Sequence, residues 1–224
     1  MRIRSFIIAY ALVLAILLFA DRRPGSTQQD RYSHVVDLTA GQTTTAPRTS
    51  TPESTTRIIA PAALIPGTWA AGQIPPERLI APLVVMDLNT ANPSVDATAQ
   101  ISLDDIAAWE SHHGMIPQGA VVAIRRLGTS DNSTTATLTP FPIAHDAAMF
   151  LIEARNTIGF AVETPVNLTF DRTLGQQLAL HGNYVLEGTQ RFTSLPATGS
   201  LIIVAPAKSK KPGAVAVRIL AMVR

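Results

Sequence analysis

The chain has 224 residues, 46% of them apolar, which suffices for one domain with a sizeable core. Its 18 Lys and Arg exceed its 16 Asp and Glu only because of Arg2 and Arg4, so residues 21–224 are neutral. A neutral body argues against a nucleic-acid partner, which requires a concentrated basic face. The lack of Cys excludes thiolate catalysis, disulfides and cysteine-ligated zinc.

Residues 1–20 combine a basic start with an apolar run, 6–20. At about 1.5 Å per residue this run spans roughly 22 Å, less than the ~30 Å hydrocarbon core of a bilayer. Such a length is typical of a signal peptide, although Leu18 is bulky for the position three residues before a cleavage site. We predict that residues 1–20 are a signal peptide or a membrane anchor. The protein is therefore expected to be exported, either periplasmic or otherwise extracytoplasmic, or held at the membrane.

Residues 21–56 read as a linker rich in Thr, Ser and Pro. A segment with so few large apolar side chains cannot bury enough surface to offset the entropy of ordering. The exception is 34–39, whose alternating pattern predicts a first strand. The remaining residues, 57–224, are expected to form the main domain.

Two helices are predicted in that domain. Ser102 and Asp105 are spaced as a capping box, and Gly114 supplies a C-terminal stop. The second helix, 146–155, has one expected apolar face, made of Ala147, Phe150, Leu151 and Ala154.

Apolar runs predict buried strands between and after these helices. They lie at 83–88, 120–124, 158–162, 183–187, 201–204 and 215–222. The only basic cluster, Lys208 to Lys211, precedes Pro212 and Gly213 and reads as a solvated turn between the last two strands. Alternating helices and strands in the middle of the chain, with strands at both ends, indicate an α/β or α+β domain with a mixed sheet.

Several sequence blocks, in order, resemble the cyclase family, whose best-known members are kynurenine formamidases. They are D-L-T at 37–39, I-P-P-E-R-L-I-A-P at 74–82, W-E-S-H-H-G-M-I-P at 109–117 and F-L-I-E-A-R at 150–155. The resemblance covers roughly residues 34–224. It implies a swivelling β/α/β-type domain that self-associates, and descent from metal-dependent hydrolases of amide C–N bonds, which use zinc or manganese.

The segment 55–63 is similar to the metal-binding motif of that family, H-x-G-T-H-x-D-x-P-x-H. Thr56, Ala60 and Pro61 match its scaffold, but the ligand positions hold Glu53, Arg57, Ile59 and Ala63. A divalent metal needs imidazole, thiolate or carboxylate donors, and a guanidinium, an alkyl chain and a methyl group provide none. We therefore predict no metal or other cofactor.

The resemblance leaves few candidate site residues. Glu187 matches a late Glu that lies beside the metal in the family. Trp69 follows the motif, and the side chains expected to line a pocket are Trp69, Arg57, Ile59 and Ala63. We predict that Arg57 takes the place of the metal and pairs with Glu187. The alternative, that Arg57 and Glu187 are unrelated, stays open.

The five His residues do not have the spacing of a metal site. His112 and His113 fall in the last turn of a predicted helix, where a cation suits the helix dipole. His145 is expected to start a helix and His181 to end one, both at the surface.

Three functions are compatible with these residues. The first is a pseudoenzyme that binds a ligand or a partner or has a structural role, because the early ligands are missing. The second is an active hydrolase of amides or cyclic amides with a rebuilt site. The third is a metal-free hydrolase in which Glu187 acts as base and Arg57 stabilises an oxyanion. The expected partners are a second copy of the chain and a small-molecule ligand, with the membrane added if residues 1–20 are retained.

Overall fold

The computed structural model describes residues 32–40, 56–88, 99–127, 140–168 and 171–224. The chain divides into two compact units, Met1–Ser33 and His34–Arg224, and the second contains every described helix and strand. The predicted signal peptide or anchor, most of the predicted linker and Glu53 lie outside the described residues. Within the described ranges, no helix has both the length and the apolar character to cross a bilayer.

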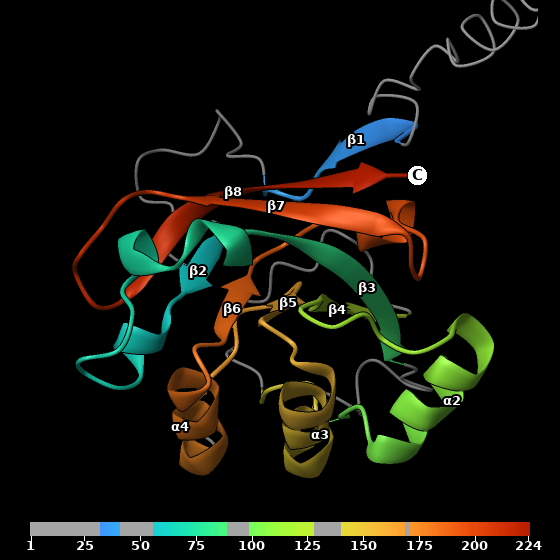
Figure 1. Cartoon of the computed structure of the whole chain (residues 1–224), viewed down its shortest axis with the longest axis horizontal. Helices are drawn as coiled ribbons and strands as arrows, with labels where there is room; N and C mark the ends of the chain where they lie inside the picture. Colours follow the sequence, from blue (N-terminus) through green and yellow to red (C-terminus); the bar gives the residue numbers. More distant parts are fainter. Residues whose placement is uncertain (1–31, 41–55, 89–98, 128–139, 169–170) are drawn as a thin grey trace, which may run out of the picture. The chain divides into compact units, whose positions relative to one another are not determined.

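Four parallel strands and three helices alternate through the middle of this unit (Figure 1). The strands lie side by side in chain order: β3 (Ile80–Leu88), β4 (Val121–Arg126), β5 (Gly159–Val162) and β6 (Tyr184–Glu187). The helices that connect them are α2 (Leu103–His113), α3 (His145–Arg155) and α4 (Arg172–Leu180). In Figure 1 all three helices lie on one side of the sheet.

Four further strands are antiparallel to their neighbours and complete the sheet. They are β1 (His34–Asp37), β2 (Arg57–Ile59), β7 (Ser200–Pro206) and β8 (Ala214–Val223). The order of the described strands is β1-β8-β2-β6-β5-β4-β3-β7, and an additional pairing of β7 with β8 closes the sheet on itself. Three-residue 3-10 turns lie at 61–63, 71–73, 76–78 and 192–194.

Closure of the sheet separates two hydrophobic cores. The inner core contains side chains from the strands and loops, such as Ile58, Leu186 and Ile202, and no residue of the three helices. The outer core lies between the parallel strands and the helices and includes Val185 and Leu151. Successive strand residues alternate between the two, as the pleat of a strand requires. The predicted mixed α/β fold is therefore confirmed.

The predicted elements are present with small shifts at their ends. Ser102 caps α2 through Asp105, and Gly114, with φ of 84°, ends it. The predicted face of α3 is wrong in part: Ala147 and Leu151 are buried, but Ala154 is exposed and Phe150 only partly buried. Ala148 and Ile152 are buried instead. The buried face of the helix is rotated relative to the predicted one because α3 contacts both α2 and α4 as well as the sheet.

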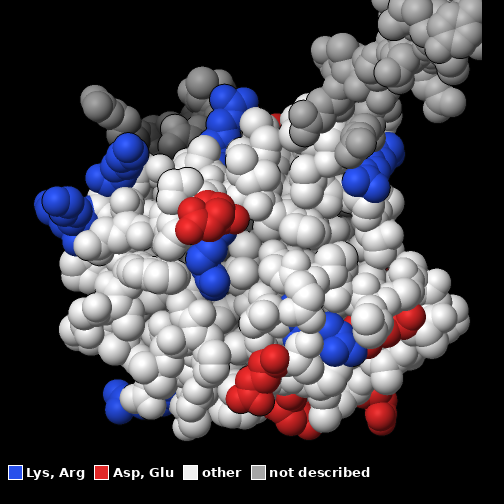
Figure 2. All heavy atoms as spheres, viewed as in Figure 1, with Lys and Arg blue, Asp and Glu red and all other residues white. Residues whose placement is uncertain are grey.

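The basic cluster lies, as predicted, in the turn between β7 and β8, where Lys208, Lys210 and Lys211 are exposed. The turn also packs on the main body, because the Gly72 N–H donates to the Ser209 carbonyl at 2.9 Å. Figure 2 shows charged side chains of both signs scattered over the viewed face rather than gathered on one element.

An ion pair between Glu110 of α2 and Arg155 of α3 ties these helices together. Arg155 donates from Nε and Nη2 to the two carboxylate oxygens at 2.7 and 2.8 Å. These bonds hold the pKa of Glu110 below its ordinary range, despite the opposing effect of burial. Because the folded-state pKa is depressed, this stabilisation is present above the pKa of the unfolded chain, about 4.3, and is lost as pH falls through the folded value.

We expect Glu110→Gln to lower the free energy of unfolding at pH 7 by about 1–3 kcal/mol, and this deficit to shrink as the pH is lowered toward 3. Denaturant unfolding of wild type and Glu110→Gln at several pH values measures this difference in the free energy of unfolding. The control is Glu153→Gln, an exposed carboxylate in α3, for which no such deficit is expected. A deficit for Glu110→Gln that is the same at pH 7 and pH 3 would contradict this explanation.

Candidate functional site

The candidate site lies where β2 runs beside β6. Arg57 is directly opposite Glu187, and Ile59 is opposite Val185. Ile59 and Val185 both pack in the outer core, so alternation places Arg57 and Glu187 on that helix side of the sheet as well. Glu187 is the last residue of β6, and the carboxyl ends of parallel strands are the usual edge for ligand sites in α/β folds.

Arg57 and Glu187 form an ion pair, as the sequence predicts. Arg57 Nη2 lies 2.5 Å from Glu187 Oε1, and the Val166 N–H donates to Glu187 Oε2 at 3.3 Å. The Glu187 side chain is only 3% exposed and that of Arg57 21%. Both carboxylate oxygens are thus in use. One guanidinium nitrogen, Arg57 Nε, is buried without a hydrogen-bond partner among the described residues.

Hydrogen bonds between two threonine hydroxyls and the backbone fix both strands around this pair. Thr56 Oγ1 donates to the Gly188 carbonyl at 2.7 Å and accepts from the Ala40 N–H at 2.7 Å. Thr189 Oγ1 donates to the Val162 carbonyl at 2.6 Å. Thr56 was predictable only as a match to the family motif, and no sequence signal pointed to Thr189. The positive φ of Gly188, 68°, marks the turn that brings these groups together.

Two of the other three ligand positions, Ile59 and Ala63, carry no donor, and the third, Glu53, lies outside the described residues. Ile59 is partly buried against the outer core, and Ala63 is exposed at the end of the 3-10 turn 61–63. Within the described ranges, no three or more His, Cys, Asp or Glu side chains are grouped so that they could hold a metal. With Glu187 already bonded to a permanent cation, the residues at these positions do not fit a divalent ion.

Trp69, the predicted pocket residue, is not brought to the ion pair. Its ring lies against Gly182, and the guanidinium of Arg78 sits 5.6 Å from the ring centroid. Gly182 precedes β6, whereas Glu187 ends it, so Trp69 packs near the opposite end of that strand. Arg78 is held there by a bond from Nη2 to the Gly182 carbonyl at 3.0 Å. Trp69 therefore contributes to packing at the amino end of the parallel strands.

A second ion pair at the carboxyl edge was not predicted. Arg125 of β4 donates from Nε and Nη2 to both oxygens of Asp87 of β3, at 2.5 and 2.8 Å, and from Nη1 to the Phe192 carbonyl at 3.1 Å. The bond to Asp87 raises the pKa of Arg125. The strand register that places Asp87 opposite Arg125 could not be predicted from the sequence. The sequence signal that could have indicated this ion pair is the presence of opposite charges at the ends of two neighbouring strands.

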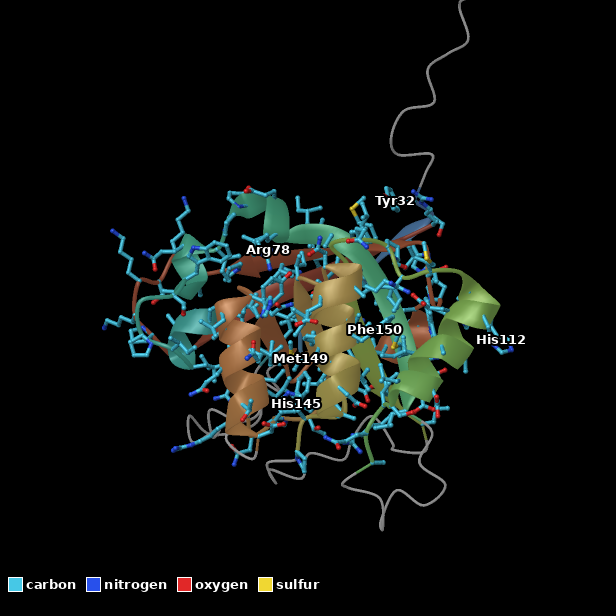
Figure 3. All side chains as sticks on the ribbon, turned by 60° about the horizontal axis from the view of Figure 1, so that its bottom comes forward. Tyr32, Arg78, His112, His145, Met149 and Phe150 are labelled. Atoms are coloured by element: carbon cyan, nitrogen blue, oxygen red, sulfur yellow. The ribbon has the colours of Figure 1, made fainter. Side chains whose placement is uncertain are left out.

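The histidines lie where the sequence predicts. His112 and His113 occupy the last turn of α2, and Figure 3 shows His112 directed away from the body. His145 begins α3 and binds Asp171, the N-cap of α4, at 2.8 Å, with both side chains exposed by more than 40%. His181 is exposed at the C-terminal end of α4. Among the residues that the structure describes, none of the four belongs to a group able to hold a metal.

Residues 25–167 match the family model described as "Putative cyclase". The chain belongs to the cyclase family. The match covers β1 through β5, and Glu187 lies beyond it. A comparison with curated proteins found no match.

Among solved structures, the chain is similar to isatin hydrolase A from Ralstonia solanacearum, with 25% identity and a TM-score of 0.67. The comparison covers 85% of this chain and 92% of that one. Isatin hydrolase A from Labrenzia aggregata has 24% identity and a TM-score of 0.67, covering 96% and 99%. A potential metal-dependent hydrolase with cyclase activity has 21% identity and a TM-score of 0.61, covering 85% and 98%. The last two comparisons concern the fold alone.

Proposed function

We propose that this chain is a non-catalytic member of the cyclase family, with a binding or structural role. In this proposal the Arg57–Glu187 ion pair stands where hydrolytic relatives bind a divalent metal. The observation that carries it is the engagement of Glu187, which is 3% exposed and bonded through both oxygens. The pair links β2, β6 and the segment after β5, as a metal with ligands on the same elements would.

The chemistry of the site supports the loss of hydrolysis. A metal in such enzymes polarises the carbonyl and generates hydroxide at neutral pH. Arg57 supplies positive charge but cannot lower the pKa of a bound water by coordination. A general base must reach the proton that it removes, and Glu187 already accepts hydrogen bonds from Arg57 and the Val166 N–H. Glu187 is therefore not free to act as a base on a substrate in this arrangement.

An active hydrolase of cyclic amides is the second candidate, favoured by the similarity to an isatin hydrolase. It would require a rebuilt metal site, with Glu53, Glu187 and a distant His, or with ligands from a neighbouring subunit. A metal-free variant of it would use Glu187 as base and Arg57 as oxyanion stabiliser.

Hydrolysis assays with isatin and an arylformamide separate these candidates. We expect turnover of the purified full chain at the uncatalysed rate, with or without added zinc or manganese. Activity that is abolished by a chelator would favour the rebuilt metal site. Activity that survives the chelator but is lost in Glu187→Gln would favour the metal-free hydrolase. Either result would refute the proposal of a non-catalytic protein.

The partners and the location belong to the same proposal. We expect association with a second copy of the chain and binding of a small-molecule ligand, with no nucleic-acid partner. The neutral composition of residues 21–224 supports the last point. Export, with cleavage or retention of residues 1–20 as an anchor, is proposed from the basic start and the apolar run of that segment.

A further inference from the structure

Charge is distributed unevenly along the chain. Glu187 is the last acidic residue, and residues 188–224 contain six Lys or Arg and no Asp or Glu. Most of these basic residues belong to β8 and to the turn between β7 and β8, where Lys208, Lys210 and Lys211 are exposed. Because residues 21–224 are neutral as a whole, the part before residue 188 carries a matching excess of acids. The β7–β8 hairpin is therefore the basic part of a neutral protein, and such an asymmetry points to a binding surface.

One face of this hairpin has no described helix packed on it. Residues of β7 and β8 contribute to the inner core and not to the outer one, which contains the helices. In Figure 1, β7 and β8 lie on the side of the sheet opposite to α2, α3 and α4. Side chains that point inward, such as Ile202 and Ala221, are buried. Their neighbours along each strand therefore point outward.

The outward side chains form an apolar surface, which we call the outer face. Strand register aligns them in cross-strand rows over β3, β7, β8 and β1. Its apolar members are Val35, Ile80, Pro82, Leu201, Ile203, Leu220 and Met222. All seven are at least partly exposed, with Ile80 at 57% and Val35 at 59%. The outward side of an antiparallel sheet is commonly polar, and an exposed apolar surface of this kind is typical of a protein or membrane contact.

The charged groups around the outer face are mainly basic. Asp37, the acidic residue in its rows, is already paired with Arg218, whose Nη2 donates to Asp37 Oδ2 at 3.0 Å, so these two charges cancel. Glu77 is exposed in the 3-10 turn before β3. Three exposed lysines of the β7–β8 turn outnumber this one acid, and no described acidic side chain forms an ion pair with any of them. The surroundings of the outer face therefore carry a net positive charge.

We propose that the outer face and the lysines of the β7–β8 turn dock this protein on an anionic lipid surface. The docking surface has to offer apolar material beside negative charge, and an anionic bilayer offers both over a wide area. The apolar side chains enter the boundary between head groups and acyl chains, as the apolar face of an interfacial helix does. The lysines lie among the lipid phosphates, where basic side chains near an anionic membrane are attracted to it.

The chain itself brings the outer face near a membrane. The apolar run 6–20, proposed above as a signal peptide or anchor, is separated from β1 by residues 21–33 only. A segment of that length spans at most about 45 Å even when fully extended. Val35 of β1 belongs to the outer face, so a retained anchor keeps this face within that distance of the bilayer. The inference goes beyond the proposed function and does not depend on the loss of hydrolysis.

An environment-sensitive fluorophore tests which face meets the lipid, since the chain has no cysteine that would compete for the label. Ile80→Cys carries the label on the outer face, on β3 rather than next to the N-terminal segment. Met115→Cys is the matched control, because Met115 is 77% exposed just after α2. The full chain in mild detergent is diluted into vesicles of phosphatidylcholine with or without phosphatidylglycerol.

We expect the label at position 80 to brighten and its emission to shift to the blue with the anionic vesicles, and the label at position 115 to stay unchanged. An unchanged label at position 80 in protein that floats with the vesicles would overturn the proposal, since residues 1–20 alone would then hold the protein. Equal responses at the two positions, or an equal response to phosphatidylcholine alone, would also overturn it. A response that needs no vesicles and grows with protein concentration would show that a second copy covers this face instead.

The lysines are tested in the same labelled Ile80→Cys protein. We expect Lys208→Gln/Lys210→Gln/Lys211→Gln to raise the concentration of anionic lipid needed for half of the response by at least about 10-fold. Lys208→Arg/Lys210→Arg/Lys211→Arg keeps the charge and should keep the response, and circular dichroism checks that both variants are folded. The same half-response concentration for the two triple variants would refute a role of the basic turn in docking.

Discussion

Replacing Glu187 with alanine is expected to lower the free energy of unfolding by about 3–5 kcal/mol. The reason is the cost of breaking a buried ion pair from one side, which leaves Arg57 and the Val166 N–H without their acceptor. Urea unfolding followed by circular dichroism measures the effect. The matched control is Arg218→Ala, which removes the exposed pair with Asp37 and should cost about 0–1 kcal/mol.

A double variant tests whether the pair itself is responsible. Arg57→Met/Glu187→Leu replaces both charges with apolar side chains of similar size, a change that is often neutral in buried pairs. We expect it to be more stable than Glu187→Ala by about 2 kcal/mol or more. If the double variant lost as much stability as the sum of the single variants Arg57→Met and Glu187→Leu, the two residues would not be coupled.

Gly159→Ala is the second substitution expected to have a large effect. A Cβ at this position of β5 would lie 2.5 Å from Cε2 of the Tyr184 ring. The ring cannot move aside easily, because Tyr184 is fully buried and its hydroxyl donates to the Arg78 carbonyl at 2.8 Å. Burial also raises the pKa of Tyr184, so it stays a neutral donor. We expect a loss of about 3 kcal/mol, at the upper end of the usual range for overpacking.

The same substitution in a Tyr184→Leu background provides the control. Without the ring, the added methyl group should cost much less than it does in wild type, even though Tyr184→Leu is itself destabilising. Thermal unfolding of the four proteins gives both costs. Equal costs of Gly159→Ala in the two backgrounds would show that the ring is not the cause.

Helices α2 and α3 and most of the strands were predictable because their signals are local, whereas the three-residue strand β2 was not predicted. The capping residues of α2 and the continuous apolar runs of β3 and β4 depend only on near neighbours in the sequence. Closure of the sheet was not predictable, because it depends on the pairing of β7 with both β3 and β8. The pairing of β7 with β3 joins residues that are far apart in the sequence. The buried face of α3 differs from the predicted one for the same reason, because the elements that pack on α3 are determined by the fold and not by the sequence of the helix.

At the site, the Arg57–Glu187 pair was predictable because both residues occupy positions that the family places around one metal. Trp69 lies against Gly182 rather than beside the ion pair, because closeness to the motif in sequence does not fix the direction of its side chain after the 3-10 turn 61–63. The Asp87–Arg125 pair needed the register of β3 on β4, which apolar runs do not specify.

Metal content of the purified full chain tests the central claim most directly. The protein would be incubated with zinc and with manganese, passed through a desalting column and examined by elemental analysis, alongside Glu187→Gln. We predict much less than one ion per chain in both proteins, because Arg57, Ile59 and Ala63 offer no donors and Glu187 is paired. About one tightly held ion per wild-type chain, lost in Glu187→Gln, would contradict the replacement of the metal by the ion pair.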